Sequence, residues 1–277
     1  MSGRPSPLDR LRDRVARLGA PLCLGIDPHP DALPEGLSPD VDGIEAFARG
    51  LLEAAAGDAA AIKVNVAFFE AFGSRGWAAL ERVRADVPPD HVLILDAKRG
   101  DVATTAERYA AGLLGHLAAD GVTLSPYLGE DGIEPFRAYP DRLAYVLART
   151  SNPSAPTIQH QAVEGGRTLA QHVAEWVASR WPEPEVGLVV GATAPDELAA
   201  LRSRVPGPAF LVPGLGAQGG DLAAAVRACH GSRAPGVVNV SRGIAGASLG
   251  ADWQRAAARA AGEWRSRMAE AGATLAL

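Results

Sequence analysis

The 277-residue sequence contains only two cysteines, Cys23 and Cys229, which fall in an expected strand and an expected helix. It contains no Cys-x-x-Cys pair and no Cys/His spacing typical of zinc ligands. The sequence therefore predicts neither a disulfide framework nor a structural zinc site. The six histidines are scattered without the spacing of a metal site or a nucleophile–base pair, and we expect them to be surface or packing residues: His29, His91, His116, His160, His172 and His230.

The sequence also lacks an excess of positive charge and any long apolar run. Its formal net charge of −5 argues against a nucleic-acid partner. No apolar run approaches the length that spans a membrane, so we expect no membrane partner. The first fifteen residues, MSGRPSPLDRLRDRV, carry charges where a signal peptide needs an apolar core, and we expect a cytoplasmic protein.

Eight short apolar segments, each followed by a longer segment with helical spacing, are present instead. They are LCLGI (22–26), AAIKV (60–64), VLILD (92–96), GVTLS (121–125), AYVLA (144–148), VGLVV (186–190), AFLVP (209–213) and GVVNV (236–240). Strands that are apolar on both faces and alternate with helices indicate a parallel sheet covered on both sides. Eight such units predict an α/β fold, a closed (β/α)8 TIM barrel. An open doubly wound sheet remains the alternative, because periodicity does not report closure.

No repeat, low-complexity segment or linker divides the chain, so we expect residues 1–277 to form a single barrel domain. In the segment 251–270 the residues Trp253, Ala257, Ala260, Trp264 and Met268 share one helical face, which predicts a helix packed on the barrel wall. The segment 151–176 is rich in proline and glycine in its first half, which predicts a loop at one end of the barrel.

Polar residues recur where the expected strands end, which is the end of a barrel that carries the active site. They are Asp27, Lys63, Asp96, Lys98, Ser151, Asn152, the segment 213–220 and the segment 241–243. A buried lysine such as Lys63 is costly unless it is paired with a carboxylate. Because side chains alternate along a strand, Asp96 and Lys98 should point the same way and meet above the barrel.

Asp101 lies three residues after Lys98, past the expected strand end. It can approach the lysine from another direction or belong to the site of a neighbouring subunit. The alternative is purely structural, with Asp101 or Thr104 capping the next helix and Glu107 completing a Thr-x-x-Glu capping box.

The segment GLGAQGG (214–220) matches the pattern GxGxxG, which is found in dinucleotide-binding proteins. Here it follows a late strand instead of the first one, and the next expected strand ends in Asn239, Val240 and Ser241 without an acidic residue. Glycines that let backbone N–H groups approach an anion, followed by Arg242, instead predict the phosphate site that barrels build from their last two loops. A surface salt bridge is the alternative role for Arg242.

Taken together, LDAKRGDVATT (95–105), LGIDP, AIKVNVAFFE, VPGLGAQGG and NVSRGI resemble the orotidine 5'-monophosphate decarboxylase family over nearly the whole chain. The TSNP turn at 150–153 is most similar to the longer bacterial branch of that family. The resemblance implies a dimeric (β/α)8 barrel without metal or organic cofactor. It implies decarboxylation of orotidine monophosphate to uridine monophosphate in pyrimidine biosynthesis, a nucleotide substrate, and active sites shared across a homodimer interface.

The resemblance also assigns roles to matching positions. Lys98 is the expected proton donor, within a catalytic array completed by Asp96, Asp101 and Lys63. Asp101 and Thr105 are expected to serve the substrate of the partner subunit. The expected substrate ligands in the chain's own site are Asp27 for the ribose, Ser151 (or Thr150) for the pyrimidine, Pro213 and Gln218 in a mobile loop, and Arg242 with Gly243 for the phosphate.

Three other functions are kept as alternatives. A DxKxxD arrangement also occurs in related barrel enzymes that act on sugar phosphates, some with a metal-held enediolate, although AIKVN combined with GLGAQGG argues against them. A non-catalytic sensor of phosphate ligands and a nicotinamide-dependent dehydrogenase are the others.

Overall fold

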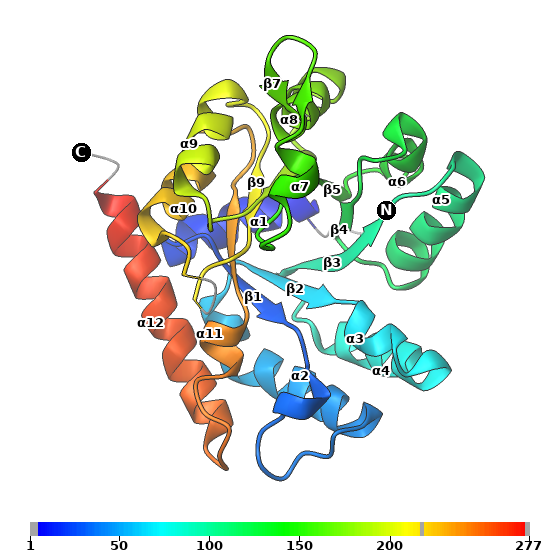
Figure 1. Cartoon of the computed structure of the whole chain (residues 1–277). Coiled ribbons are helices and arrows are strands. Elements are labelled where there is room, and N and C mark those ends of the chain that lie inside the picture. Colours follow the sequence, from blue (N-terminus) through cyan, green and yellow to red (C-terminus); the bar gives the residue numbers. More distant parts are fainter. Residues whose placement is uncertain (1–4, 217–218, 275–277) are drawn as a thin grey trace.

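Eight parallel strands close into a barrel in the computed structural model, which describes residues 5–216 and 219–274 (Figure 1). Each strand pairs with the next, and the last returns to the first. They are β1 (Leu22–Ile26), β2 (Ala61–Asn65), β3 (Val92–Arg99), β4 (Gly121–Leu124), β5 (Leu143–Arg149), β8 (Val186–Val190), β9 (Phe210–Val212) and β10 (Val237–Val240). The predicted (β/α)8 fold is confirmed, and the open sheet is excluded. All eight predicted strands are present, although β3 continues to Arg99 instead of ending at Asp96.

Helices surround the barrel and cover its outer face (Figure 1). Their bounds are α1 (Pro7–Leu18), α2 (Val41–Ala55), α3 (Ala67–Glu70), α4 (Gly73–Asp86), α5 (Ala103–Ala110), α6 (Glu134–Arg137), α7 (Pro156–Gln159), α8 (Leu169–Arg180), α9 (Pro195–Arg204), α10 (Leu222–Cys229), α11 (Arg242–Ala245) and α12 (Trp253–Ala273). Trp253, Ala257, Ala260 and Met268 of α12 are buried and Trp264 packs against the same core, so the predicted stripe does face the barrel wall.

The alternation of side chains along each strand divides the core into two layers. In β1, Leu22, Leu24 and Ile26 belong to the layer between barrel and helices, while Cys23 belongs to the barrel interior. Most strand residues therefore have apolar neighbours on one side of the sheet or the other, which is why the strands are apolar on both faces. Cys23 and Cys229 are free and buried, in agreement with the absence of a predicted disulfide.

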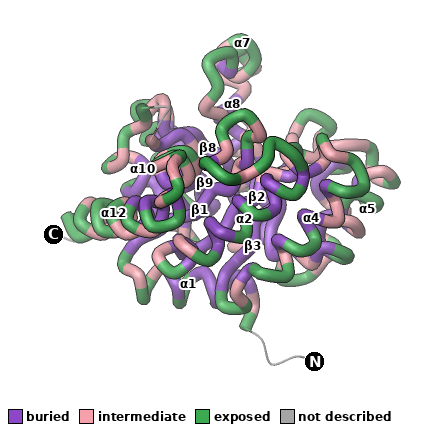
Figure 2. The backbone as a smooth tube through the Cα atoms, turned by 90° about the horizontal axis from the view of Figure 1, so that it is seen from below, coloured by how far each residue is buried: buried purple, intermediate pink, exposed green. Residues whose placement is uncertain are grey.

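Helix α1 closes the end of the barrel at which the strands begin. Its residues Leu8 and Leu11 pack into the interior layer. The Ser6 hydroxyl caps the helix by accepting a hydrogen bond from the Asp9 backbone N–H at 3.1 Å, and Gly19 ends it in the left-handed region at φ 63°. Figure 2 shows α1 at the opposite end of the molecule from α7.

The segment 151–176 lies at the end where the strands finish, as predicted, but it is more ordered than a plain loop. It contains α7, a two-stranded hairpin made of β6 (Ala162–Val163) and β7 (Arg167–Thr168), and the start of α8. Thr168 and Gln171 form a capping box that begins α8. In the part of the chain that the structure describes, no helix is both long and apolar enough to cross a membrane.

Candidate active site

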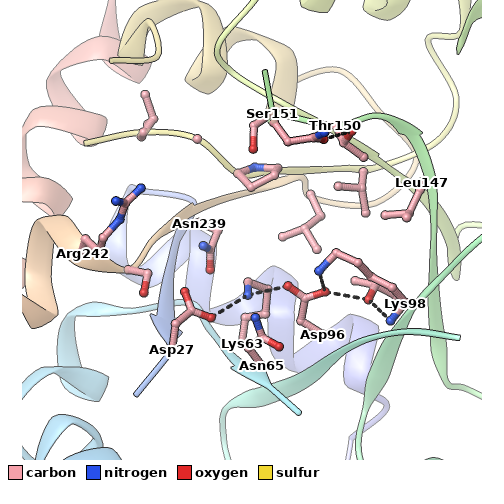
Figure 3. A pocket seen from close by; sticks show the side chains of 18 of the residues that line it. Asp27, Lys63, Asn65, Asp96, Lys98, Leu147, Thr150, Ser151, Asn239 and Arg242 are labelled. Carbon is pink, nitrogen blue, oxygen red and sulfur yellow. Dashed lines mark hydrogen bonds and ion pairs between the residues drawn. The ribbon is translucent and has the colours of Figure 1, made fainter. Parts of the chain in front are cut away.

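A cavity of about 510 Å³ opens where the barrel strands end (Figure 3). It brings together seven of the residues predicted from the sequence: Asp27, Lys63, Asp96, Lys98, Ser151, Pro213 and Arg242. These residues come from the ends of six different strands, so only closure of the barrel makes them neighbours.

The alternation of the strands explains why polar side chains reach this cavity. Lys63 lies two residues after Ala61, and Asp96 lies two residues after Ile94; Ala61 and Ile94 are both in the interior layer. Lys63 and Asp96 therefore continue the inward-facing rows of β2 and β3 upward from the apolar interior. In both strands a charge follows an apolar inward residue, so an apolar floor lies below it and the cavity lies above.

Alternating charges run along one side of the cavity. Lys63 Nζ lies 3.7 Å from Asp27 Oδ1 and 2.9 Å from Asp96 Oδ2, and Asp96 Oδ1 lies 2.6 Å from Lys98 Nζ. Side-chain exposure is 5% for Lys63 and 11% for Asp96, but 50% for Lys98. The predicted meeting of Asp96 and Lys98 is confirmed, and Lys98 is the more exposed of the two lysines in this row.

The surroundings keep these groups ionised. Burial opposes the charge on Lys63, but the negative charges of Asp27 and Asp96 more than offset it and raise the pKa of Lys63. Burial likewise opposes the charge on Asp96, but Lys63 and Lys98 hold the pKa of the carboxyl far below its usual range. Lys63 and Asp96 therefore present fixed charges at neutral pH.

Thr123 of β4 supports this network and was not predicted. Its hydroxyl donates to Asp96 Oδ1 at 2.9 Å and accepts from the Lys98 backbone N–H at 3.0 Å. The pairing of β3 with β4 shifts register between Leu95 and Arg99, and Lys98 has a φ of 45°. The end of β3 is therefore bulged, and Thr123 holds the bulged backbone in place. The threonine inside the apolar segment GVTLS is the feature of the sequence that could have identified this residue.

The opposite side of the cavity is built from the loops after β9 and β10. Pro213, Gly214 and Leu215 line this side together with Ser241 and Arg242. Gly214 has a φ of 103°, a conformation that residues with a Cβ rarely adopt. Arg242 is labelled in Figure 3 on the far side from Lys98. An arginine beside a glycine-containing loop is an arrangement suited to an anion such as a phosphate.

One predicted residue of this side, Gly243, is not among the residues that line the cavity. Gly243 lies next to Arg242 but packs on α12, where its carbonyl accepts a hydrogen bond from Trp264 Nε1 at 3.2 Å. A Cβ at position 243 would come within 3.0 Å of the indole nitrogen, so this glycine permits close packing. Gln218 lies outside the described residues.

The loop after β5 contributes both candidates for contact with a pyrimidine. Thr150 and Ser151 each line the cavity. Gln159 of α7, which was not predicted, holds Thr150: its Oε1 accepts from the Thr150 N–H at 2.9 Å and its Nε2 donates to the Thr150 hydroxyl at 2.7 Å.

His160, predicted to be a surface or packing residue, lies on the surface and pairs with Glu197 at 3.0 Å.

Asp101 and Thr105 do not line the cavity of their own chain. Asp101 Oδ1 accepts a hydrogen bond from the Val102 N–H at 2.8 Å, and Thr105 lies on α5. The capping alternative is wrong: α5 begins after Val102, and no side chain caps it. Within residues 5–216 and 219–274, no group of three or more His, Cys, Asp or Glu side chains is arranged to hold a metal ion.

Comparison with known proteins bears on this geometry. Residues 20–260 match the profile of the orotidine 5'-phosphate decarboxylase / HUMPS family. The chain belongs to this family. An orotidine 5'-phosphate decarboxylase of Roseiflexus castenholzii is 47% identical over 248 residues, which cover 88% of this chain and 90% of the relative. The relative of the same name from Herpetosiphon aurantiacus is 43% identical over 241 residues, covering 87% and 89%.

A solved structure of Leishmania donovani OMP decarboxylase is similar throughout. It superposes with a TM-score of 0.79 at 39% identity and covers 95% of this chain and 98% of that one. The family resemblance seen in the sequence motifs is confirmed.

Proposed function

We propose that this protein decarboxylates orotidine 5'-monophosphate to uridine 5'-monophosphate, a carbon–carbon lyase reaction of pyrimidine biosynthesis. The proposal rests on the two sides of one cavity. One side carries a row of alternating charges, namely Asp27, Lys63, Asp96 and Lys98, and the opposite side carries an arginine beside a glycine-containing loop. A nucleotide matches these two sides, with its phosphate at Arg242 and its base at Lys98. The relatives named orotidine 5'-phosphate decarboxylase support the same substrate.

The charge row suits the difficult part of this reaction. When the bond between the pyrimidine ring and its carboxylate breaks, the electron pair stays on the ring carbon, where ring carbonyls stabilise it poorly. We propose that the Lys98 ammonium stabilises this developing charge and then protonates the carbon. The resulting amine regains its proton from solvent, because half of the Lys98 side chain is exposed. An ammonium fixed in place before the reaction costs no reorganisation in the transition state.

Asp96 has two roles in this proposal. It holds the Lys98 ammonium at 2.6 Å, and its negative charge lies where the substrate's carboxylate must leave. Two unit charges about 4 Å apart interact by roughly 4 kcal/mol at an effective dielectric constant near 20. This repulsion disappears as carbon dioxide departs, so it favours the transition state over the bound substrate. Lys63 keeps Asp96 ionised throughout.

The phosphate side supplies binding energy away from the reacting bond. Arg242 can grip a phosphate with two parallel hydrogen bonds, which lysine does less well. In the proposal Ser151 or Thr150 contacts the pyrimidine, and Gln159 keeps their loop over the base through its two bonds to Thr150. Binding at these distant groups excludes water from the charge row and orients the ring.

We further propose that the active enzyme is a homodimer in which Asp101 and Thr105 complete the partner's site. Neither residue lines the cavity of its own chain, and the Asp101 carboxylate bonds only a neighbouring backbone N–H among the described residues. Val102 and Tyr109, which lie close to Asp101 in the sequence, expose 54% and 38% of their surfaces. Tyr127, in the loop after β4, exposes 86%. Exposed apolar side chains of this kind are suited to a subunit interface.

Mixing two inactive variants tests the shared site. Lys98→Ala and Asp101→Ala each remove one half of every site, but a mixed dimer contains one site with both wild-type residues. Refolding the two together should restore about a quarter of wild-type activity, as expected for random pairing in a twofold dimer. No recovery despite mixed dimers on a native gel would refute sharing.

The function itself is tested by following the absorbance of orotidine 5'-monophosphate with purified protein in the presence of a chelator. We expect conversion to uridine 5'-monophosphate, with Lys98→Ala as the background control. Absence of turnover by the intact protein would defeat the proposal, and turnover lost only with chelator would favour a metal-dependent relative. We also propose that the whole chain is one domain and that the protein is cytoplasmic. Limited proteolysis would test the domain organisation, and cell fractionation would test the location.

A further inference from the structure

Strand β10 carries a polar side chain that the proposed mechanism does not use. Asn239 is only 7% exposed, yet its side chain lines the active-site cavity. It lies two residues after Val237 of the interior layer, so it follows an apolar inward residue of β10, as Lys63 and Asp96 do on their strands. Figure 3 shows it between Arg242 on one side and Asp27 and Lys63 on the other.

The Asn239 amide lacks a hydrogen bond that its burial demands. Among residues 5–216 and 219–274, its Oδ1 has no hydrogen-bond partner. The same holds for Asp27 Oδ1, whose neighbouring cation Lys63 lies 3.7 Å away, beyond hydrogen-bond distance. Buried polar atoms in native proteins are nearly always paired, and each exception asks for an explanation. Two unpaired acceptors on the same cavity point to a ligand with two donors.

The fold makes room for this amide. A Cβ at Gly25 of β1 would lie 2.9 Å from Asn239 Oδ1 and 2.8 Å from the Ser241 Cβ. Strand β1 pairs directly with β10, with Cys23 opposite Asn239. Glycine at the next inward position of β1 therefore leaves the gap that the amide fills. Any larger residue there would push the amide out of its place between Asp27 and Arg242.

We propose that Asn239 is a specificity-determining residue that reads the sugar of the nucleotide. The inference rests on the proposed function, which puts the base at Lys98 and the phosphate at Arg242 and so leaves the sugar between them. The vicinal hydroxyls of a ribose carry two donors, one for Asp27 and one for Asn239. A nucleotide that lacks the hydroxyl facing Asn239 leaves the buried amide unpaired and binds less tightly.

Product binding tests this role without requiring turnover. Calorimetry would compare uridine 5'-monophosphate with its 2'-deoxy and 3'-deoxy forms on wild type, Asn239→Ala and Asn239→Asp. Wild type should bind one of the deoxy forms at least about tenfold more weakly than the ribonucleotide. Asn239→Ala should abolish most of that preference, and Asn239→Asp, which keeps an acceptor, should retain it. Asn152→Ala, which alters another asparagine of the cavity, should leave the preference unchanged.

The outcomes separate this inference from the function on which it rests. If wild type binds the ribonucleotide but Asn239→Ala weakens all three ligands equally, or none of them, Asn239 does not read the sugar. If folded wild type binds no uridine 5'-monophosphate at all, the proposed function fails and this inference fails with it. Urea unfolding of each variant shows whether a loss of binding reflects a loss of folded protein.

Discussion

Both ends of the barrel bury charged side chains, but these side chains have different kinds of partner at the two ends. At the end closed by α1, Arg10 and Arg14 are each 5% exposed. Arg10 pairs with Asp120 and bonds the His91 carbonyl, while Arg14 donates to the carbonyls of Ala59 and Ala56. At the open end, Lys63, Asp96 and Lys98 bond mainly one another and line a cavity.

The difference separates structural charges from charges available for chemistry. At the α1 end, the backbone carbonyls of Ala56, Ala59 and His91 accept hydrogen bonds from the two arginines, so these charges tie α1 to the barrel. At the open end, Asp27 and Asn239 each have an acceptor oxygen that finds no partner among the described residues, and half of the Lys98 side chain is exposed. Similar burial thus ties elements together at one end and, in the proposed function, binds the nucleotide at the other.

The largest expected effect comes from the open end. Lys98→Ala should lower turnover of orotidine 5'-monophosphate by more than about 10⁴-fold, since it removes both charge stabilisation and the proton donor. The midpoint of urea unfolding should barely move, because the side chain is half exposed. Steady-state kinetics and unfolding on the same preparation check both parts. A large loss of stability would blur the distinction between the two ends.

Arg10→Met at the closed end should show the reverse pattern. It leaves Asp120, whose side chain is 3% exposed, with the Leu93 backbone N–H at 2.9 Å and with Arg142 at 3.3 Å in place of its closest cation. We expect a loss of about 3–5 kcal/mol in the free energy of unfolding and an unchanged kcat for the protein that remains folded. Arg12→Met on the same helix is the matched control, since its side chain is 45% exposed and should matter by less than about 1 kcal/mol.

Arg242 offers a test within the open end itself. Arg242→Ala should raise KM for orotidine 5'-monophosphate by about 100-fold, the equivalent of roughly 2–3 kcal/mol for a charge-assisted contact. Arg242→Lys should recover only part of this loss, because lysine cannot form two parallel hydrogen bonds. Inhibition by inorganic phosphate measures the same contact. If Arg242→Ala and Arg242→Lys raise KM by the same factor, the arginine does not form two parallel hydrogen bonds with the phosphate.

The smallest expected effect is a pH dependence at the closed end. Partial burial opposes the charge on Asp90, but His91 and Arg14 lower the pKa of Asp90 to about 2. Because this value lies below the usual value near 3.9, the carboxylate stabilises the fold above about pH 4 and loses this effect as the pH falls toward 2. The stability difference between wild type and Asp90→Asn should shrink over that range in urea titrations. It should stay below about 1 kcal/mol, since Asp90 is half exposed.

Much of the fold could be predicted from the sequence, because the apolar pattern of each strand and helix is local. Apolar segments such as LCLGI and VGLVV lie in the strands predicted for them, and the stripe on α12 faces the barrel. The end of β3 was less predictable. Its bulge and the support from Thr123 depend on how β3 pairs with β4, and one strand alone carries no information about that register.

The same limit applies to the site. The charged residues were identified because a buried lysine or aspartate is costly wherever it occurs, so Lys63 and Asp96 stand out in an apolar strand. Asn239 and Gln159 did not stand out, since an uncharged amide is ordinary in a sequence. Their importance comes from the groups they meet or fail to meet, namely the Thr150 loop for Gln159 and an unfilled hydrogen bond for Asn239.

The sequence by itself determined the order of strands and helices, the inward position of each charge and the family motif, because these depend on spacing along one chain. Only the tertiary structure decided closure, the bulge at Lys98, the separation of Asp101 from its own cavity and the gap that Gly25 leaves for Asn239. Contacts between strands depend on register and on the sizes of side chains that are far apart in sequence, so they exist only once the barrel has closed.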